Sequence, residues 1–160
     1  MKYIVSCKYM DKSIKLQNVP HDKEKMNIIS IFFDTFVSSI SKISESQFLL
    51  GLYNGILIEY ELFENEKTGE SVLTRKRNIF AHKKAITVIE VFQKLGIIVT
   101  AGDDGFIYIR KLYDFEILTV IKLKPFLKCQ KIKISENNLL YALIHLLFYN
   151  ILLILNFLFP

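Results

Sequence analysis

Three side chains near the middle of the sequence, His82, Asp103 and Asp104, have the chemistry of a catalytic or metal-binding cluster. An imidazole beside a carboxylate can move a proton, and the same groups can hold a cation. The two aspartates, however, belong to Gly102-Asp103-Asp104-Gly105, a tight-turn sequence with a local reason to exist. No second His or carboxylate lies nearby at ligand spacing. We therefore expect no catalytic residue, no metal, no cofactor and no enzyme activity.

Other reactive groups are equally isolated in the sequence. There is no Gly-rich phosphate loop and no nucleophile elbow. Cys7 and Cys129 lack metal-ligand spacing and form no disulfide framework, which fits a reducing, intracellular setting. Near the start of the chain, Lys8, Asp11 and Lys12 come too early for the apolar core of a signal peptide, so secretion is not expected.

A basic group lies in the predicted outer strand over 72–80 and in the loop that follows it, and two interpretations of this group stay open. Its members are Arg75, Lys76, Arg77, Lys83 and Lys84. They could contact anionic lipid headgroups or an acidic peptide, or they could protect an edge strand from pairing. The net charge of +5 fits either interpretation. Nucleic acid is not an expected partner, because the group is short and lacks interleaved stacking residues.

Short β-strands must position these side chains. In residues 81–112, an alternating apolar segment covers 86–92, a second β-rich run covers 96–100, and 106–109 leaves the Asp-Gly turn as a strand. Glycine supplies the positive φ that such a hairpin turn needs. This layout puts His82 before the first strand and Asp104 in the turn between the second and third.

The same layout recurs along the chain. The hairpin turns Asp11-Lys12-Ser13, Asn54-Gly55-Ile56 and Asp104-Gly105-Phe106 occupy equivalent places, so Asp11, Asn54, Gly55 and Gly105 are expected to make the turns. Outer strands are predicted over 27–33, 72–80 and 116–123, a charged loop over 63–71, and the beginning of a fourth unit over 130–144. Hydrophobic residues make up 51% and aromatic residues 13%, which favours an all-β chain.

Repeated four-strand units of this length are typical of a WD40-type β-propeller. About three units are recognisable, whereas closed propellers have 4 to 8 blades. We therefore expect residues 1–144 to form an incomplete propeller, a fragment with apolar faces left uncovered.

The residues also carry a resemblance to a family. The SC-x-x-x-D-x-S run at the start, the Asn54-Gly55 hairpin, and the histidine-led unit ending in GDDG resemble the WD40 region at the C-terminal end of BEACH-domain proteins, the neurobeachin and lysosomal-trafficking-regulator family. The resemblance implies a non-catalytic scaffold that binds proteins in vesicle or lysosomal membrane traffic. It also implies a cytoplasmic location with peripheral association on anionic intracellular membranes, protein partners, and no small-molecule substrate.

The same resemblance implies a structural role for the cluster of the opening paragraph. WD40 units join a His, a Ser or Thr, an Asp and a Trp by hydrogen bonds, and here His82, Thr100 and Asp104 match in order. The place of the Trp-Asp pair holds Arg110-Lys111, and the chain has no Trp at all. We expect a structural set and not a reactive one.

The end of the chain departs from this pattern. Residues 139–160 contain no Asp, Glu, Lys or Arg over 22 positions, enough to span a bilayer as a helix. Three interpretations of residues 145–160 stay open: a hydrophobic helix, a membrane anchor that would make this a tail-anchored protein with a small cytosolic β-domain, and the translation of an AT-rich non-coding stretch.

Overall fold

The structure, a computed structural model, describes residues 2–7, 12–19, 28–65, 71–124, 127–134, 139–146 and 149–156. Within these ranges the chain is all β apart from one short 3-10 helix, and it forms four antiparallel sheets. This confirms the predicted fold class. In every sheet, strands that follow one another in the chain pair with one another.

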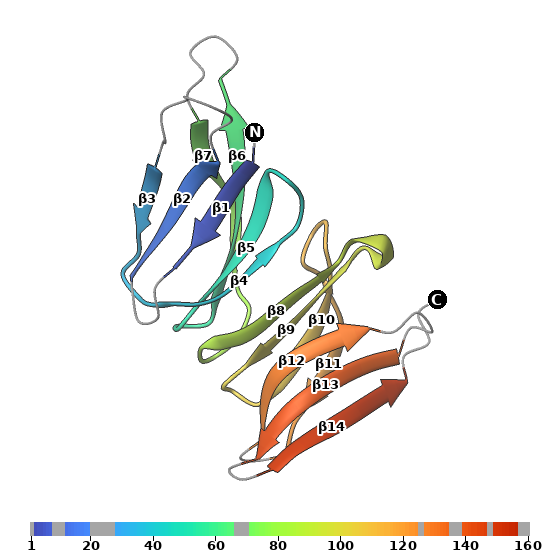
Figure 1. The fold of residues 1–160 in the computed structure, drawn as a ribbon. Helices are drawn as coiled ribbons and strands as arrows, with labels where there is room; N and C mark the ends of the chain where they lie inside the picture. Colours follow the sequence, from blue (N-terminus) through green and yellow to red (C-terminus); the bar gives the residue numbers. More distant parts are fainter. Residues whose placement is uncertain are drawn as a thin grey trace.

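The four sheets follow one another along the chain, from the blue end of Figure 1 to the red end. The first contains β1 (Lys2–Ser6), β2 (Ser13–Val19) and β3 (Ile28–Phe32). The second contains β4 (Val37–Lys42), β5 (Gln47–Leu52), β6 (Ile56–Glu64) and β7 (Ser71–Phe80). The third contains β8 (Ile86–Phe92), the 3-10 helix η1 (Gln93–Leu95), β9 (Ile97–Gly102), β10 (Phe106–Lys111) and β11 (Ile117–Lys122). The fourth contains β12 (Lys128–Ile134), β13 (Leu139–Leu146) and β14 (Tyr149–Asn156).

Residue pattern decides which faces of these strands are covered. In β2, Ile14 and Leu16 are buried while Lys15 between them is exposed, the alternation of a strand covered on one face. All six residues of β9 are buried, and its sequence IIVTAG is a continuous small and apolar run. Such a run indicates a central strand covered on both faces.

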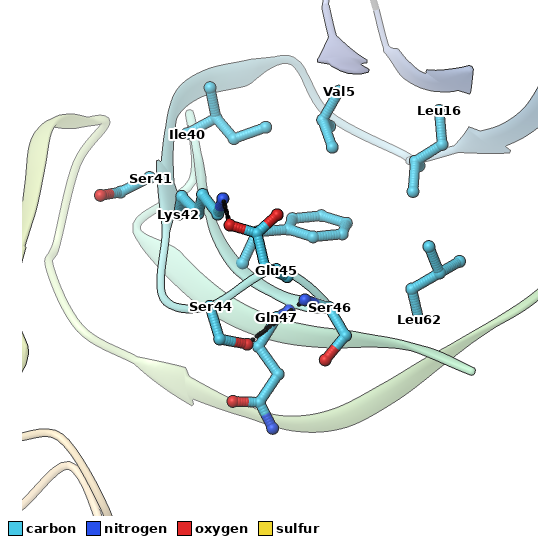
Figure 2. A pocket seen from close by; sticks show the side chains of 11 residues that line it. Val5, Leu16, Ile40, Ser41, Lys42, Ser44, Glu45, Ser46, Gln47 and Leu62 are labelled. Carbon is cyan, nitrogen blue, oxygen red and sulfur yellow. Dashed lines mark hydrogen bonds and ion pairs between the residues drawn. The ribbon is translucent and has the colours of Figure 1, made fainter. Parts of the chain in front are cut away.

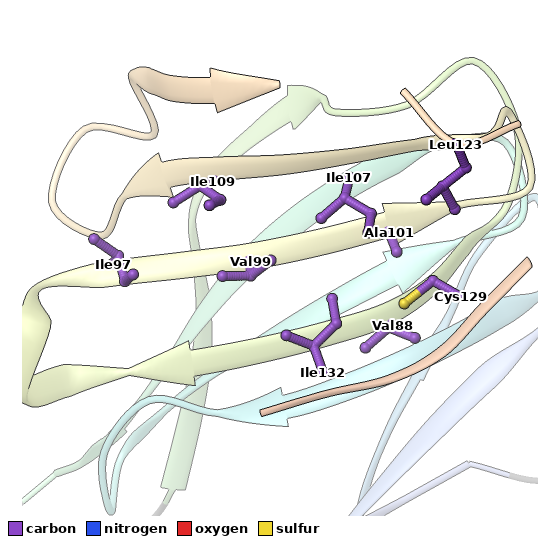
Figure 3. Close-up of a cluster of buried hydrophobic side chains, with 9 residues drawn as sticks. All are labelled: Val88, Ile97, Val99, Ala101, Ile107, Ile109, Leu123, Cys129 and Ile132. Carbon is purple, nitrogen blue, oxygen red and sulfur yellow. The ribbon is translucent and has the colours of Figure 1, made fainter. Parts of the chain in front are cut away.

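Three clusters of buried side chains hold the sheets together, one at each junction. Ile14 and Leu16 pack against the second sheet, while Leu49 and Ile98 belong to the cluster between the second and third sheets. Figure 3 shows the cluster in which Cys129 and Ile132 of β12 meet the third sheet. Burying one such Leu or Ile side chain is worth about 1.5–3 kcal/mol. Stacking therefore supplies the main stabilisation of the fold.

The same backbone hydrogen bond recurs at the hairpin of each of the first three sheets. The carbonyls of Lys12, Gly55 and Gly105 each accept a bond from the residue that follows the outer strand, with donors Phe33 N at 2.7 Å, Ala81 N at 3.0 Å and Leu123 N at 2.8 Å. These bonds give the sheets one common register. Asp11, predicted in the first turn, lies outside the described residues.

The predicted charged loop over 63–71 is shorter than expected. Phe63 and Glu64 belong to β6 and Ser71 begins β7, because the ladder continues through the pairs Phe63↔Val72 and Glu64↔Ser71. Backbone pairing with a neighbouring strand outweighs the polar composition there.

One of the three interpretations of the end of the chain, a hydrophobic helix, is contradicted by the structure. The described residues of that stretch form β13 and β14, which pair along their whole length from Leu139↔Asn156 to Leu146↔Tyr149. The expected boundary at residues 144 and 145 lies within β13. Pairing with β12 and with each other satisfies the backbone polar groups that a helix would have satisfied internally. Across the residues that are placed, no helix has the length and apolarity needed to cross a bilayer.

Candidate functional site

His82 occupies the connection between β7 and β8, at the junction of the second and third sheets. Its side chain is fully buried, and its ring meets Tyr108 edge to face at 4.9 Å between centroids. Gly102 makes room for this ring, since a Cβ at that position would overlap its Nδ1. A buried imidazole needs partners for both nitrogens.

The structure brings His82, Thr100 and Asp104 together. Nδ1 of His82 lies 3.0 Å from Oδ1 of Asp104, and Nε2 lies 2.9 Å from Oγ1 of Thr100. An ionised carboxylate only accepts hydrogen bonds, so Nδ1 carries the proton and donates to Asp104, and the Thr100 hydroxyl donates to Nε2. Oδ2 of Asp104 also accepts from the backbone N of Lys83 at 2.8 Å. The group therefore joins the entering loop to β9 and to the β9–β10 turn.

Burial and hydrogen bonding shift both titrating groups. Burial lowers the pKa of His82, and this effect outweighs the opposing influence of the Asp104 carboxylate. Burial acts to raise the pKa of Asp104, but the hydrogen bonds from His82 and from the Lys83 backbone together lower it. At neutral pH the pair is a neutral imidazole beside a carboxylate.

Asp103, the neighbour of Asp104, makes a backbone contact with the loop before β8. Its backbone N donates to the carbonyl of Ala85 at 2.9 Å. Within the ranges that the structure places, no three His, Cys, Asp or Glu side chains gather as ligands for a metal ion. The cluster suggested by residue types is thus reduced to one histidine, one carboxylate and one hydroxyl that bind one another.

Arg110 is a member of this region that sequence reasoning did not single out for a role. It is 5% exposed, and its guanidinium lies 4.7 Å from the centroid of the Tyr108 ring. Nη2 donates to the carbonyl of Ala81 at 3.1 Å and Nη1 to that of Phe115 at 3.3 Å. The sequence did contain a signal of this role. Arg110 is a charged residue within the apolar alternation of β10, at the place where a Trp was expected.

Two members of the predicted basic group form ion pairs with glutamates. Lys76 Nζ lies 2.7 Å from Glu61 Oε2, and Arg77 pairs with Glu59 while donating to the carbonyl of Leu112 at 2.6 Å. Arg77 thereby joins β7 of the second sheet to the turn after β10. The other three members, Arg75, Lys83 and Lys84, are exposed.

The hairpin turns have the geometry that their residues allow. Gly55 and Gly105 adopt positive φ of 84° and 81°. Asn54 is exposed, and its side-chain oxygen accepts from the backbone N of Ile56 at 3.3 Å. The turns thus fix the positions at which the next sheet begins.

A groove opens between the first and second sheets. Its volume is about 250 Å³, and Figure 2 shows Val5 and Leu16 on one side and Ile40 on the other. Lys42 and Glu45, which also line the groove, form an ion pair of 2.5 Å, and both side chains are largely exposed. No sequence pattern predicted this groove, because it lies between residues of separate sheets.

Comparison with known proteins identifies the architecture. The crystal structure of the WD40 β-propeller domain of Doa1 is similar to this chain, with a TM-score of 0.59 and 18% sequence identity. The match covers 82% of this chain and 40% of that one, so this chain spans less than half of the propeller it resembles. No family model and no curated protein sequence matches. The likeness shows the fold: the four sheets are those of a WD40-type β-propeller, present in part.

Proposed function

We propose that this chain is a non-catalytic scaffold that binds proteins, and that it belongs to a BEACH/WD40-type protein acting in vesicle or lysosomal membrane traffic. The propeller fold supports the general part of this proposal, since rigid stacked sheets present loops and edges to partners. The sequence resemblance described above supports the finer part.

One observation carries the proposal: the outer strands expose large apolar side chains. Phe32 at the end of β3 is 79% exposed, and Phe80 at the equivalent end of β7 is 76% exposed. Seven exposed apolar residues lie on the outer strands β3, β7 and β11 of three sheets, namely Ile28, Phe32, Val72, Phe80, Ile117, Leu118 and Val120. Aromatic side chains such as those of Phe32 and Phe80 are enriched at protein interfaces.

The polar cluster supports a scaffold better than it supports an enzyme. Both nitrogens of His82 are occupied, and the ring is fully buried. A general base must reach the proton that it abstracts, within about 3 Å or through one water. A ring enclosed in this way holds the loop in place and has no route to a substrate.

Association with an anionic membrane remains a subsidiary part of the proposal. Arg75, Lys83 and Lys84 supply exposed positive charge, while Lys76 and Arg77 already pair with glutamates. Each basic residue near an anionic surface contributes about 1 kcal/mol. Three such residues would give a weak, salt-sensitive attachment.

Proximity labelling in cells tests the proposal. The wild-type chain is compared with the double variant Phe32→Ser/Phe80→Ser, and Tyr113→Ser serves as the control because Tyr113 is 72% exposed but lies off the outer strands. We expect the double variant to lose at least three quarters of the labelled proteins and the control to retain them.

The identity of the labelled proteins tests the finer part. Enrichment of vesicle-coat or lysosomal-membrane components supports the traffic assignment, and their absence contradicts it. An unchanged set of labelled proteins in the double variant would refute binding through Phe32 and Phe80 of the outer strands. Co-sedimentation with phosphatidylserine vesicles, with and without 0.5 M salt, checks the membrane component: no sedimentation at low salt contradicts it.

A further inference from the structure

A pocket of about 240 Å³ lies between the first and second sheets, on the side of their outer strands. It shares no lining residue with the groove of Figure 2. Leu52, Ile58 and Tyr60 are its buried residues, whereas Phe32 and Arg75 line it and are exposed. Pockets for drug-sized ligands have about 300–1,000 Å³, so this one has room for one or two side chains.

The third sheet shows what fills the equivalent place there. The backbone N of Phe33 and that of Ala81 make the same bond to the preceding hairpin, so Asp34, the next residue, is the equivalent of His82. His82 is fully buried against the Tyr108 ring, whereas Asp34 is exposed. The residue of this chain that fills the equivalent place is therefore present in the second sheet, but its short side chain leaves the pocket open. All lining residues of the pocket lie between positions 32 and 78.

Arg75 supplies positive charge to this pocket. Within the ranges that the structure places, no ion pair includes Arg75, although the next two basic residues of β7 pair with glutamates. Burial raises the pKa of Tyr60, and the nearby Arg75 guanidinium acts in the opposite direction. An exposed guanidinium beside buried side chains suits a carboxylate, which it can bind through two parallel hydrogen bonds.

Spacing along β6 defines the side chains that a ligand would present. Ile58 and Tyr108 each lie three residues after the glycine of their turn, so Ile58 occupies the place of the ring that meets His82. Tyr60, two residues further on, pairs with Arg75. Two residues of an extended chain cover about 7 Å and return to the same face. A peptide with one side chain over Ile58 thus places the side chain two positions away beside Arg75.

Aromatic rings already meet in this pocket. Phe33 meets Tyr60 edge to face at 6.4 Å between centroids, and both residues line the pocket. An added ring can pack against such rings in the same way. The third sheet contains this combination of groups, since the Tyr108 ring contacts both the His82 ring and the Arg110 guanidinium. An aromatic side chain is therefore the ligand group that the place beside Ile58 favours.

Asp34 determines which end of the pocket takes an anion. It lies in the connection from β3 to β4, which contacts the β5–β6 turn through the bond from Tyr53 N to the carbonyl of Phe36, 2.9 Å. Arg75 lies further along β6, opposite Tyr60. A carboxylate beside Asp34 would be repelled, so the acidic group of a ligand belongs at the Arg75 end.

We propose that this pocket binds an extended segment of a partner protein that presents an aromatic side chain and, two residues away, an Asp or Glu. The ring enters the place that His82 takes in the third sheet, and the carboxylate pairs with Arg75. The inference rests on the proposed function, because Phe32 of the outer strands also lines the pocket. It names the chemistry of the segment that the scaffold selects.

Fluorescence anisotropy with the full chain and labelled peptides tests this proposal. The peptides STFTETS and STETFTS carry the two side chains in the two chain directions. In each, replacing Glu by Gln or Phe by Ala gives a control of the same length. We expect saturable binding of at least one of the two peptides and at least tenfold weaker binding of its controls. No binding of either peptide, or equal binding of a peptide and its controls, would overturn the proposal.

A reversal of charge makes the test specific to the pocket. Arg75→Glu should weaken binding of the acidic peptide at least tenfold and should permit binding of the peptide in which Lys replaces Glu. Lys84→Glu is the matched control, because it makes the same change of charge at an exposed residue that does not line the pocket. Circular dichroism and melting temperature verify that both variants fold. Equal weakening by the two variants would show attraction to the whole chain, and the proposal would fail.

Other outcomes separate this inference from the proposed function. If proximity labelling depends on Phe32 and Phe80 while neither peptide binds, only the pocket inference fails. If a peptide binds through Arg75 but Phe32→Ser/Phe80→Ser leaves labelling unchanged, binding through the outer-strand phenylalanines fails and the pocket stands. If the chain dimerises in sedimentation and Arg75→Glu abolishes the dimer, a second copy occupies the pocket, and a partner segment is refuted.

Discussion

His82 and Arg110 show how single residues hold a junction between sheets. The imidazole connects the entering loop to β9 and to the β9–β10 turn, and the guanidinium reaches the carbonyls of Ala81 and Phe115. Burial lowers the pKa of Arg110, but an arginine remains charged at neutral pH. Leaving such buried groups without partners costs about 1–3 kcal/mol each.

We expect the free energy of unfolding to decrease as the pH falls from 7 to 5. The pKa of His82 in the folded chain is lowered, chiefly by burial, below the unfolded value of about 6.5. Between these two values the unfolded chain binds a proton that the folded chain does not, so stability is lost as the pH falls. The lowered pKa of Asp104 adds a second loss below about pH 4.

Urea unfolding at several pH values measures this effect. His82→Gln serves as the comparison, because His21 and His145 remain in both proteins and their titration cancels in the difference. At pH 7 the free energy of unfolding of the variant should be lower than that of the wild type. The difference between the two should decrease toward pH 5. If the free energies of unfolding of the wild type and the variant changed with pH by the same amount, His82 would not titrate as described.

The two cysteines should differ strongly in reactivity. Cys7 is exposed, whereas Cys129 is 1% exposed, and burial raises its pKa to about 11 despite a contact with the backbone of Lys131. Only the thiolate reacts. With a maleimide at pH 7.5 and mass spectrometry, we expect one addition, at Cys7, within minutes and the second only after denaturation. Equal labelling of both sites in the native chain would contradict burial of β12 against the third sheet.

At the scale of elements, each hairpin turn fixes where the next sheet begins. The carbonyl of Gly55 accepts from the backbone N of both Ala81 and His82, each at 3.0 Å, so the turn of one sheet fixes the start of the next. Gly55 and Gly105 share positive φ, but their surroundings differ. A Cβ at Gly55 would overlap the carbonyl of His82, whereas nothing lies within 4 Å of a Cβ at Gly105.

This difference gives a matched pair of substitutions. Gly105→Ala should lower the free energy of unfolding by about 1–2 kcal/mol, because a residue with a Cβ is strained in a left-handed conformation. Gly55→Ala should lose more than about 4 kcal/mol, because it adds a backbone clash. Urea unfolding of both variants checks the prediction, and similar losses would refute the close approach of the turn to His82.

At the scale of the whole molecule, coverage of the sheets decides their stability. The second and third sheets are packed on both faces, while the first is packed on one, and its other face exposes Ile4 at 55% and Ile28 at 52%. In a stacked repeat, stability depends on contacts with neighbours.

Native hydrogen exchange should follow this coverage. We expect amides of β5 and β9 to be the most protected and amides of β1 and β3 to exchange first, by at least a hundredfold in rate. Mass spectrometry of peptic fragments resolves these strands. Uniform protection of the described strands would mean that the uncovered face does not lower the stability of the first sheet.

The sequence by itself determined the local structure and much of the repeat. Alternation located the strands, and glycine beside Asn or Asp located the hairpins, because both depend on neighbours in the chain. The set of His82, Thr100 and Asp104 was implied by the resemblance to WD40 repeats, and the structure places these side chains within hydrogen-bonding distance.

Only the tertiary structure decided how separate sheets meet. Residues 139–156 have the length and apolarity of a helix, yet strand pairing with β12 makes the described part β13 and β14. The burial of Arg110, the pairing of Lys76 and Arg77 with glutamates, and the groove beside Ile40 each depend on residues far apart in the chain. Periodicity reports only which face of a strand is covered, whereas packing between sheets decides what covers it.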